Sequence, residues 1–505
     1  MASSQRSKLD AVFVIPGNHG SVYQALGAQF AAIEPPSLAG LFATYLRSHG
    51  CAAGLVDAPA WNLSPQAAAQ QVIDGGLPLL VVVVVYGSQP SASTQTMPAA
   101  GEFCRALKEL RPDAKILMTG THPAALPERT LREEAIDFVC GGEGPVTILR
   151  TVEALRAGAD SFRSVPGLWY RQGGVVMSNP APALIEDLDG AMPGVAWDLM
   201  PMQRYRAHNW HCFERLGERQ PYAAIHTTLG CPYRCAFCCI NAPFGKPSYR
   251  MWSPDSVIAE IGLLVERHGV RNLKIVDEMF VLNRNHVAAI CDRIIERGYD
   301  LNIWAYARID TVTEDQLERM RRAGFRWLAV GIESGSQHVR DGVAKGGYGA
   351  NDILRTVRAI QDAGIHVLGN YIFGLPDDTE ASMQETLDLA LEANCEFANF
   401  YCGMAYPGSR LHANALAEGW RLPESWSGYS QHGYECTPLP TRALSSEQVL
   451  AFRDRALAGY FSGRRYLDMV RAKFGAEVEA HVQDMTRVAL PRKLLAGRPV
   501  ELAHA

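Results

Sequence analysis

The sequence predicts an α/β protein with two successive parts built from βα repeats, followed by a helical region. Three observations support this. Apolar and helical segments alternate through residues 1–150, a second rhythm of strand, helix and glycine runs over residues 221–410, and this rhythm stops after Pro407. Such alternation is typical of parallel sheets covered by helices. At 505 residues the chain is too long for one ordinary core, so several domains are expected.

The first 150 residues contain five short apolar segments that we expect to be strands. Leu79–Val85 is apolar throughout, as a parallel strand buried on both faces should be. Helices are expected near 38–48 and 99–110. Five strands with crossover helices form a doubly wound, flavodoxin- or Rossmann-like domain, whose ligand should lie beyond the carboxyl ends of the strands. The expected strands are 11–16, 53–57, 79–85, 115–120 and 137–140.

Residues 151–220 change character and are expected to connect two domains. Gly167–Met177 reads as a hairpin with Gly-Gly at its turn, and the following stretch is rich in proline and aspartate.

Residues 221–410 predict six βα units, which form a partial TIM-type (β/α)6 barrel with chemistry at the carboxyl ends of its strands. The first helix, Pro254–His268, follows a Ser253 cap and stops at Gly269. We expect 411–505 to form a third, mainly helical domain that faces the substrate.

Composition excludes several classes of protein. The net charge is −5 and no basic run is present, so no nucleic-acid surface is expected. The longest apolar run, 77–86, is about half the length that spans a bilayer. The first residues do not resemble a secretory signal. A cytoplasmic protein without membrane contact is therefore expected.

Three cysteines follow the first barrel strand with the spacing CxxxCxxC: Cys231, Cys235 and Cys238. Iron–sulfur clusters take thiolate ligands, normally four for a [4Fe–4S] unit, so three thiolates leave one iron open. Cys239 is adjacent to Cys238 and should point elsewhere. A zinc site or a chance spacing are the alternatives. The other eight of the twelve cysteines are scattered singly and are expected to be small buried hydrophobes.

With Phe237 before the third cysteine, this loop resembles the signature of the radical S-adenosylmethionine (radical SAM) superfamily. The resemblance implies that S-adenosylmethionine chelates the open iron of a [4Fe–4S] cluster. It also implies that one electron, from an external donor such as flavodoxin or ferredoxin, splits the cofactor into methionine and a 5′-deoxyadenosyl radical.

Further strand ends match places where this superfamily binds S-adenosylmethionine. Each has a structural alternative, such as a helix-capping acid for the acidic pair or a structural ion pair for the arginine. The candidates are Asp277 or Glu278 for the methionyl amino group, Arg308 for its carboxylate, Glu333 and Ser334 for ribose or polar atoms, and Asn370 and Gly374 near the adenine.

The N-terminal domain resembles the cobalamin-binding subfamily of these enzymes. Its GTHP and GGEG stretches match that subfamily's "GGxHP" and "GEGE" stretches, and glycine loops at the carboxyl edge would admit a flat corrin. A flavodoxin-like domain without a cofactor is the alternative. The implied cobalamin-binding residues are Asp57, Trp61, Ser88, Ser91, Gly120, His122, Gly142 and Glu143.

One departure from the better-known corrinoid proteins concerns the lower face of cobalt. Their DxHxxG motif supplies an imidazole, but Pro59 stands in the histidine position and Asn62 in the glycine position. We therefore expect water or a side chain such as Trp61 below the metal.

With both cofactors, the resemblance implies radical methylation of an sp3 carbon in a small biosynthetic intermediate. The alternatives are radical oxidation, cyclisation or rearrangement without methyl transfer, and a sensor without turnover. The sequence does not name the substrate. Its specificity should lie within 404–440 and the C-terminal domain, although core packing or solvent exposure is the better explanation for each candidate side chain there. These candidates are Tyr406, Arg410, His412, Trp426 and Tyr429.

Overall fold

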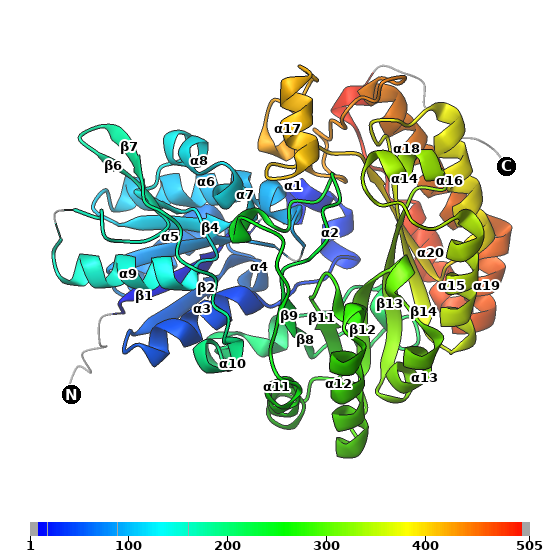
Figure 1. The fold of residues 1–505 in the computed structure, drawn as a ribbon, viewed down its shortest axis with the longest axis horizontal. Coiled ribbons are helices and arrows are strands. Elements are labelled where there is room, and N and C mark those ends of the chain that lie inside the picture. The colour runs from blue at the N-terminus through cyan, green and yellow to red at the C-terminus, as the bar shows by residue number, and fades with distance from the viewer. Residues whose placement is uncertain (1–8, 18, 88, 160, 497–505) are drawn as a thin grey trace. The chain divides into compact units, whose positions relative to one another are not determined.

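A computed structural model describes residues 9–17, 19–87, 89–159 and 161–496 (Figure 1). The chain forms two compact units. The first contains residues 1–18, 35–202 and 239–250, and the second contains 19–34, 203–238 and 251–505. Each unit therefore includes a short segment whose sequence neighbours belong mainly to the other unit.

The first unit is built on a seven-stranded sheet with the order β2-β1-β3-β4-β5-β6-β7. Strands β1 to β5 are parallel, and their order 2-1-3-4-5 is that of flavodoxin-like doubly wound domains. The predicted fold class of this domain is confirmed. Its strands are β1 (Ala11–Ile15), β2 (Ala53–Asp57), β3 (Leu80–Val85), β4 (Ile116–Gly120), β5 (Phe138–Cys140), β6 (Leu168–Gln172) and β7 (Val175–Ser178).

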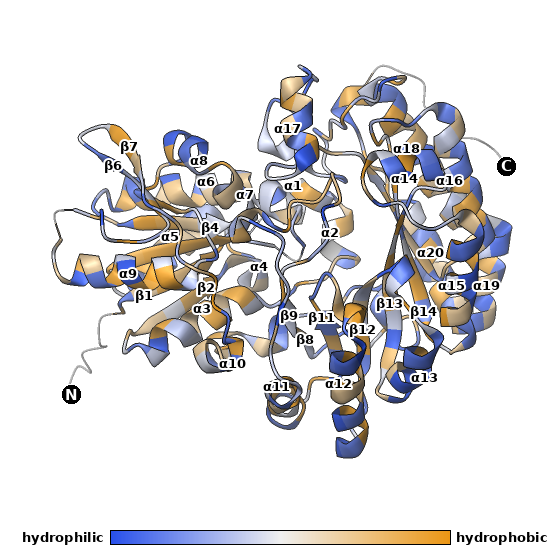
Figure 2. Ribbon diagram, in the orientation of Figure 1, coloured by the Kyte–Doolittle hydropathy of each residue, from blue (hydrophilic) through white to orange (hydrophobic). Residues whose placement is uncertain are grey.

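The strands of this sheet are strongly apolar (Figure 2). Every residue of β3 is buried, which explains its unbroken hydrophobic sequence. The helices and turns of the unit are α3 (Ser37–Ser48), α4 (Ala58–Trp61), α5 (Pro65–Asp74), α6 (Ala92–Leu110), α7 (Thr121–Ala125), α8 (Pro127–Glu133), α9 (Pro145–Arg156), α10 (Leu188–Ala191), η1 (Trp197–Leu199) and η4 (Ala242–Phe244).

Two elements of the first unit differ from the sequence prediction. Helix α6 begins at Ala92 rather than near residue 99, and Pro98 lies inside it. The β6–β7 hairpin is not part of a separate connector. Strand β6 pairs antiparallel with β5, so the hairpin extends the sheet, with Gly173 and Gly174 at positive φ in its turn.

The second unit is built on a six-stranded parallel sheet with the order β15-β14-β13-β12-β11-β8. Each strand pairs with its neighbour in sequence, as βα repeats require. The six predicted barrel strands are confirmed. Its strands are β8 (Tyr222–Ile225), β11 (Asn272–Ile275), β12 (Asn302–Arg308), β13 (Phe325–Glu333), β14 (His366–Phe373) and β15 (Phe397–Cys402). The short strands β9 (Thr228–Leu229) and β10 (Arg250–Met251) form a separate two-stranded sheet.

The predicted helix 254–268 forms α11 (Pro254–His268). Ser253 accepts a hydrogen bond from Ser256 N, and Gly269 ends the helix with φ 66°. The other elements are α1 (His19–Tyr23), α2 (Leu26–Gln29), η2 (Met202–Arg204), η3 (Trp210–Cys212), η5 (Phe280–Leu282), α12 (Arg284–Arg297), η6 (Ile309–Thr311), α13 (Glu314–Arg322), α14 (Gln337–Gly342), α15 (Ala350–Asp362) and α16 (Glu380–Ala393).

An aromatic cluster forms the core near the amino ends of these strands. The Trp210 ring lies 5.1 Å from that of Trp304 and 5.2 Å from that of Trp327, in edge-on contacts. Trp210, from the expected connector, thus packs at the amino ends of the strands, opposite the carboxyl ends where the chemistry is predicted.

The C-terminal region belongs to the second unit. It contains α17 (Arg410–Ala417), η7 (Trp426–Tyr429), α18 (Ser446–Ser462), α19 (Arg464–Phe474), α20 (Ala476–Thr486) and η8 (Lys493–Leu495). Helix α18 packs on β15, and Arg453 Nε donates to Phe400 O at 2.7 Å. No helix within the described ranges has the length and apolar character needed to cross a membrane.

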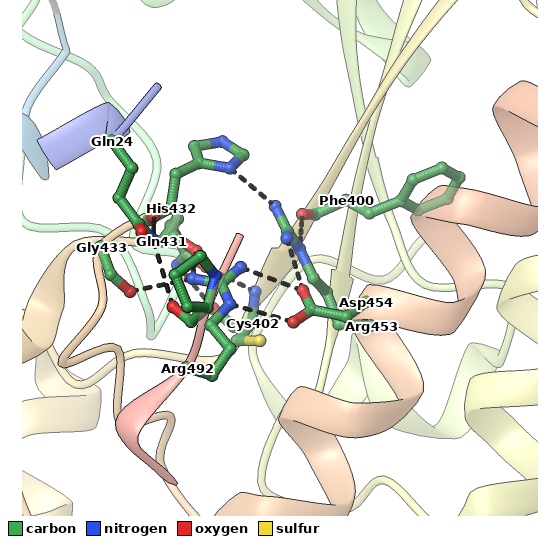
Figure 3. A network of polar contacts seen from close by, with 10 residues as sticks. Gln24, Phe400, Cys402, Gln431, His432, Gly433, Arg453, Asp454 and Arg492 are labelled. Atoms are coloured by element: carbon green, nitrogen blue, oxygen red, sulfur yellow. Dashed lines mark hydrogen bonds and ion pairs between the residues drawn. The ribbon is translucent and has the colours of Figure 1, made fainter. Parts of the chain in front are cut away.

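A buried polar network holds this region in place (Figure 3). Asp454 accepts from Arg453 at 2.8 Å and from Arg492 at 3.0 Å. Although burial opposes its ionisation, the two guanidinium groups hold the pKa of Asp454 below its ordinary value. Arg492 also donates to Gln431 O and Gly433 O. Through Arg492, the Asp454 carboxylate therefore joins α18 to the segment after α20 and to the loop that precedes α18.

Gly120, which ends β4, adopts φ 153°, and a Cβ atom there would overlap Val85 O of the neighbouring strand. Because backbone cannot give way, we expect Gly120→Ala to destabilise the protein by about 2–4 kcal/mol. Gly217→Ala is the control, since nothing lies within 4 Å of its added methyl group. Thermal unfolding of the two variants checks this, and equal melting temperatures would contradict it.

Candidate cofactor-binding and active site

The cysteine loop starts from a fixed point at the end of β8. Thr227 donates its backbone N–H to Asp277 Oδ1 at 2.7 Å and its hydroxyl to Asp277 Oδ2, and His286 Nε2 lies 3.1 Å from that hydroxyl. Burial raises the pKa of Asp277 to about 6, and the hydrogen bonds from Thr227 partly oppose this. Asp277 is therefore occupied in joining the ends of β8 and β11.

The three predicted cluster ligands lie together on the loop after Thr227. Cys231 is buried, while Cys235 and Cys238 are partly accessible. Arg308 Nη1 lies 3.5 Å from Cys235 Sγ, and its guanidinium stacks over the Tyr233 ring at 4.5 Å. Three thiols on one loop, with Cys235 beside a fixed cation, form a donor set that suits an iron–sulfur cluster with negative charge on its sulfurs.

No group of three or more His, Cys, Asp or Glu side chains in the described part of the chain is arranged around a single metal ion. A cubane does not require such a group, because each thiolate binds a different iron.

Cys239 is buried and begins the segment 239–250, which belongs to the first unit, whereas Cys231, Cys235 and Cys238 belong to the second. This placement supports the prediction that Cys239 is not a cluster ligand.

Glu278 differs from its neighbour Asp277. Among the described residues its carboxylate makes no hydrogen bond and no ion pair, although its side chain lies near the charges of Lys274 and Lys345. Burial raises the pKa of Glu278 to about 7, and the two lysines oppose this. Of the two acidic candidates for the methionyl amino group, Glu278 is the one whose carboxylate is not already hydrogen-bonded to a neighbouring strand end.

Glu333 lies at an irregularity in the pairing of β13 with β14 and has φ 69°. Positive φ is uncommon for a side chain of this size and marks stored strain, which tends to collect at functional sites. Lys345 Nζ holds its carboxylate at 2.8 Å, and both side chains are about nine-tenths buried. Lys345 was not among the residues predicted from the sequence. The one local feature that marks its position is the glycine pair Gly346-Gly347 that follows it.

The remaining candidates of the second unit already have partners. Arg308 Nε donates to Asp310 at 2.6 Å. The Ser334 hydroxyl is buried against Thr386, and Asn370 accepts from Asn399 at 3.0 Å. A Cβ at Gly374, with φ 80°, would overlap Val449 of α18, so α18 occupies the space that this glycine leaves.

The first unit presents its candidates at the carboxyl edge of the sheet. Asp57 caps α4 by accepting from Ala60 N at 3.1 Å, and Trp61 at the end of α4 is 45% exposed. An exposed tryptophan at this edge offers an apolar face of the kind that a corrin could cover. Ser88 lies outside the described residues, and Ser91 precedes α6 without capping it.

His122 is buried in α7, with Nδ1 3.1 Å from Thr94 Oγ1, and its backbone N–H donates to Ser93. The nearest atom to a Cβ at Gly142 would be Pro182 Cδ at 3.9 Å, so Gly142 leaves open space for a flat ligand. The residues at this edge therefore fit a corrin through glycine backbone and Trp61.

Glu143 uses its carboxylate within the protein. Oε1 lies 2.6 Å from Arg250 Nη2, and Oε2 accepts from Ile185 N at 3.2 Å. Glu34 likewise pairs with buried Lys274 at 2.9 Å in the second unit. Neither basic partner was identified from the sequence, because each lies far from its partner in the chain.

The substrate candidates in 404–440 are mainly structural. Tyr406 and Tyr429 are buried, and the Tyr406 hydroxyl donates to Tyr429 O at 3.2 Å. His412 is also buried, Trp426 is half-buried against Tyr429, and Arg410 is exposed.

The second unit has a parallel sheet whose first strand leads into a three-cysteine loop, and the first unit is a flavodoxin-like domain with a glycine-lined edge. Together these features define a B12-binding radical SAM enzyme. Residues 225–390 match the radical SAM superfamily and residues 23–151 match the B12 binding domain. The chain is 30% identical to an uncharacterized methyltransferase from Pyrococcus horikoshii over 372 residues, which are 74% of this chain and 77% of that protein. It belongs to this family, and its cofactors are a [4Fe–4S] cluster, S-adenosylmethionine and cobalamin.

Two further relatives were found. The chain is 28% identical to the anaerobic magnesium-protoporphyrin IX monomethyl ester cyclase of Rubrivivax gelatinosus, over 79% of this chain and 69% of that protein. Its fold is similar to that of the radical S-adenosylmethionine methyltransferase TsrM from Kitasatospora setae, with a TM-score of 0.67 and 18% identity over 91% of this chain and 90% of that one.

We expect alanine at Cys231, Cys235 or Cys238 to abolish the cluster and with it the formation of 5′-deoxyadenosine. Anaerobically reconstituted wild-type protein should bind about four iron and four sulfide. Cys239→Ala should keep both the iron content and the cleavage of S-adenosylmethionine. An essential Cys239 would show that the open iron is wrongly assigned.

Glu278→Gln should weaken S-adenosylmethionine binding about ten- to a hundredfold while sparing the cluster, because one charge-assisted hydrogen bond is lost. Asp277→Asn should instead lower the melting temperature, because its carboxylate joins two strand ends. Anaerobic equilibrium dialysis and thermal unfolding separate the two effects. Equal affinity in wild type and Glu278→Gln would remove Glu278 from the cofactor site.

Proposed function

We propose that the protein methylates an sp3 carbon of a small biosynthetic intermediate by a radical route. The observation that carries this proposal is Pro59, which lies inside α4 where an imidazole ligand for cobalt would stand. Asp57, which matches the aspartate of that motif, accepts a hydrogen bond from Ala60 N at Oδ1. A cobalt with a weak lower ligand or none suits delivery of a methyl radical, whereas a strong ligand favours methyl cation transfer. Water or a side chain such as the exposed Trp61 would then meet the lower face of the corrin.

S-adenosylmethionine supplies a carbon-centred radical and cobalamin supplies the methyl group. We propose that Cys231, Cys235 and Cys238 hold the cluster and that Glu278 accepts a hydrogen bond from the methionyl amino group. Arg308, fixed by Asp310, binds the methionyl carboxylate.

The strained Glu333 turn, held by Lys345, places polar atoms at the end of β13 toward the ribose. Ser334 and Gly374 shape the backbone there, and Asn370 lies toward the adenine. Gly120, Gly142, Glu143, His122 and Ser91 shape the corrin edge, and Ser88, outside the described residues, stays a candidate cobalamin contact.

We further propose that the electron comes from an external donor such as flavodoxin or ferredoxin, and that the protein works in the cytoplasm. The twelve free cysteines of the chain suit a reducing compartment.

A second candidate function is radical oxidation, cyclisation or rearrangement without methyl transfer. The similarity to a magnesium-protoporphyrin IX monomethyl ester cyclase over 79% of this chain favours it. The two functions use the same cofactors and differ in whether a methyl group reaches the product.

Product analysis distinguishes the two functions. With S-adenosylmethionine carrying a deuterated methyl group, radical methylation should place three deuteriums in the product, because the methyl hydrogens take no part in the reaction. One cofactor molecule supplies the radical and another the methyl group, so 5′-deoxyadenosine and S-adenosylhomocysteine should form in about equal amounts. Mass spectrometry and chromatography of the nucleosides check this. Deoxyadenosine without S-adenosylhomocysteine, in the presence of the true substrate, would establish the second function instead.

A further inference from the structure

A short segment joins the cluster loop to the cobalamin domain. Residues 239–250 begin directly after Cys238, yet they belong to the first unit. Within this segment, the turn η4 packs against α7, the helix that follows β4. Because β4 is a parallel strand, α7 lies at the carboxyl edge, where a doubly wound domain binds its ligand. The segment that leaves the cluster loop therefore forms part of the edge that receives cobalamin.

The far end of this segment is held by a buried ion pair. Arg250 Nη2 lies 2.6 Å from Glu143 Oε1, and Arg250 Nη1 donates to Ile185 O at 2.6 Å. The side chains of Arg250 and Glu143 are only 5% and 8% exposed. The Arg250 guanidinium also lies 5.3 Å from the Phe244 ring of η4, so it contacts the middle of its own segment as well.

Glu143 is fixed in turn by the loop after β5. Its backbone carbonyl accepts from the Tyr86 hydroxyl at 3.0 Å, and Oε2 accepts from Ile185 N. The following Gly144 has φ 124°, and a Cβ there would lie 2.8 Å from the Phe42 ring. Tyr86 and Phe42 therefore contact the GGEG loop within the cobalamin domain, and the Glu143 carboxylate contacts Arg250 of the segment 239–250. A ligand that orders this loop also orders the segment, because buried charges tolerate little separation.

We propose that the Glu143–Arg250 pair positions the segment after the cluster cysteines and so couples the cobalamin site to the cluster loop. Cobalamin bound at the glycine-lined edge stabilises the GGEG loop. Through its ion pair with Glu143, Arg250 then holds the segment 239–250 in place. Cys238, which directly precedes this segment, is fixed as a result. S-adenosylmethionine, which binds the open iron, then binds more tightly. Glu143 and Arg250 are positioning residues. The proposal rests on the cofactors and not on methyl transfer.

Coupling of this kind is reciprocal, because cobalamin must strengthen S-adenosylmethionine binding by the same factor as S-adenosylmethionine strengthens cobalamin binding. Anaerobic equilibrium dialysis measures both affinities on the reconstituted full chain with an oxidised cluster, using hydroxocobalamin. Neither reductant nor substrate is present, so no turnover occurs, and failure of the proposed methylation would leave this result unchanged.

For the wild type we expect cobalamin to tighten S-adenosylmethionine binding at least about fivefold, the lower end of typical coupling. Glu143→Gln and Arg250→Met should reduce this ratio to near one. Because each leaves one buried charge unpaired, Glu143→Met/Arg250→Met removes both charges together and should fold with the same loss of coupling. Arg250→Lys keeps the ion pair and should retain most of the ratio.

Lys108→Gln is the matched control. Lys108 pairs with Asp137 at 2.8 Å in the same unit, but Asp137 precedes β5 and so lies at the opposite, amino edge of the sheet. Its ratio should equal that of the wild type. Hydrogen exchange of peptides covering 228–250 should slow on adding hydroxocobalamin in the wild type and in Lys108→Gln, and should not change in the doubly substituted protein.

Two results would overturn the proposal. The first is a wild-type ratio of one, with S-adenosylmethionine bound equally well in the presence and absence of cobalamin. The second is a wild-type ratio in the doubly substituted protein, which would show that order reaches the cluster loop by another route.

Discussion

The hydrogen bonds between Asp277 and Thr227 are the contact on which the radical SAM site depends. They join the ends of β8 and β11 directly before the cysteine loop, so that a loop with little regular structure begins from a rigid point. Burying a carboxylate is costly, and the raised pKa of Asp277 records that cost. The two hydrogen bonds from Thr227 offset part of this cost, and His286 contacts the Thr227 hydroxyl that donates one of them. Burial also raises the pKa of the adjacent Glu278, whose carboxylate makes no hydrogen bond and no ion pair among the described residues. This combination is typical of ligand-binding groups.

Parallel topology explains why the other candidates gather as they do. In both sheets the carboxyl ends of the strands lie along one edge, so residues distant in sequence become neighbours. The units also exchange segments. Residues 19–34 belong to the second unit and end at Glu34, which pairs with Lys274, while residues 239–250 belong to the first and end at Arg250, which pairs with Glu143. A buried ion pair tolerates little misplacement, so each pair fixes the end of an exchanged segment.

The structure also gives several motif residues a task other than the one that their motif implies. Gly120 and Gly374 are small because Val85 and Val449 approach them, and the Ser334 hydroxyl is bonded to Thr386. Glu143 is the clearest case, since its carboxylate is used by Arg250 and Ile185. Residues of this kind shape a cofactor site through the backbone that they hold, and the groups free to touch a ligand are fewer than the motifs suggest.

The sequence alone determined the fold class and nearly every strand, and it predicted the three cluster cysteines. These depend on local signals: apolar runs such as 80–85, the Ser253 cap and Gly269 stop, and the spacing within one loop. It also narrowed the acidic candidates to Asp277 and Glu278, but only tertiary structure separated them, because Thr227 lies fifty residues away. Lys345 beside Glu333, Arg250 beside Glu143 and the hairpin that joins the first sheet were decided in the same way. Ion pairs and strand pairing between distant segments leave no pattern in a single sequence, since either partner alone reads as an ordinary surface charge or strand.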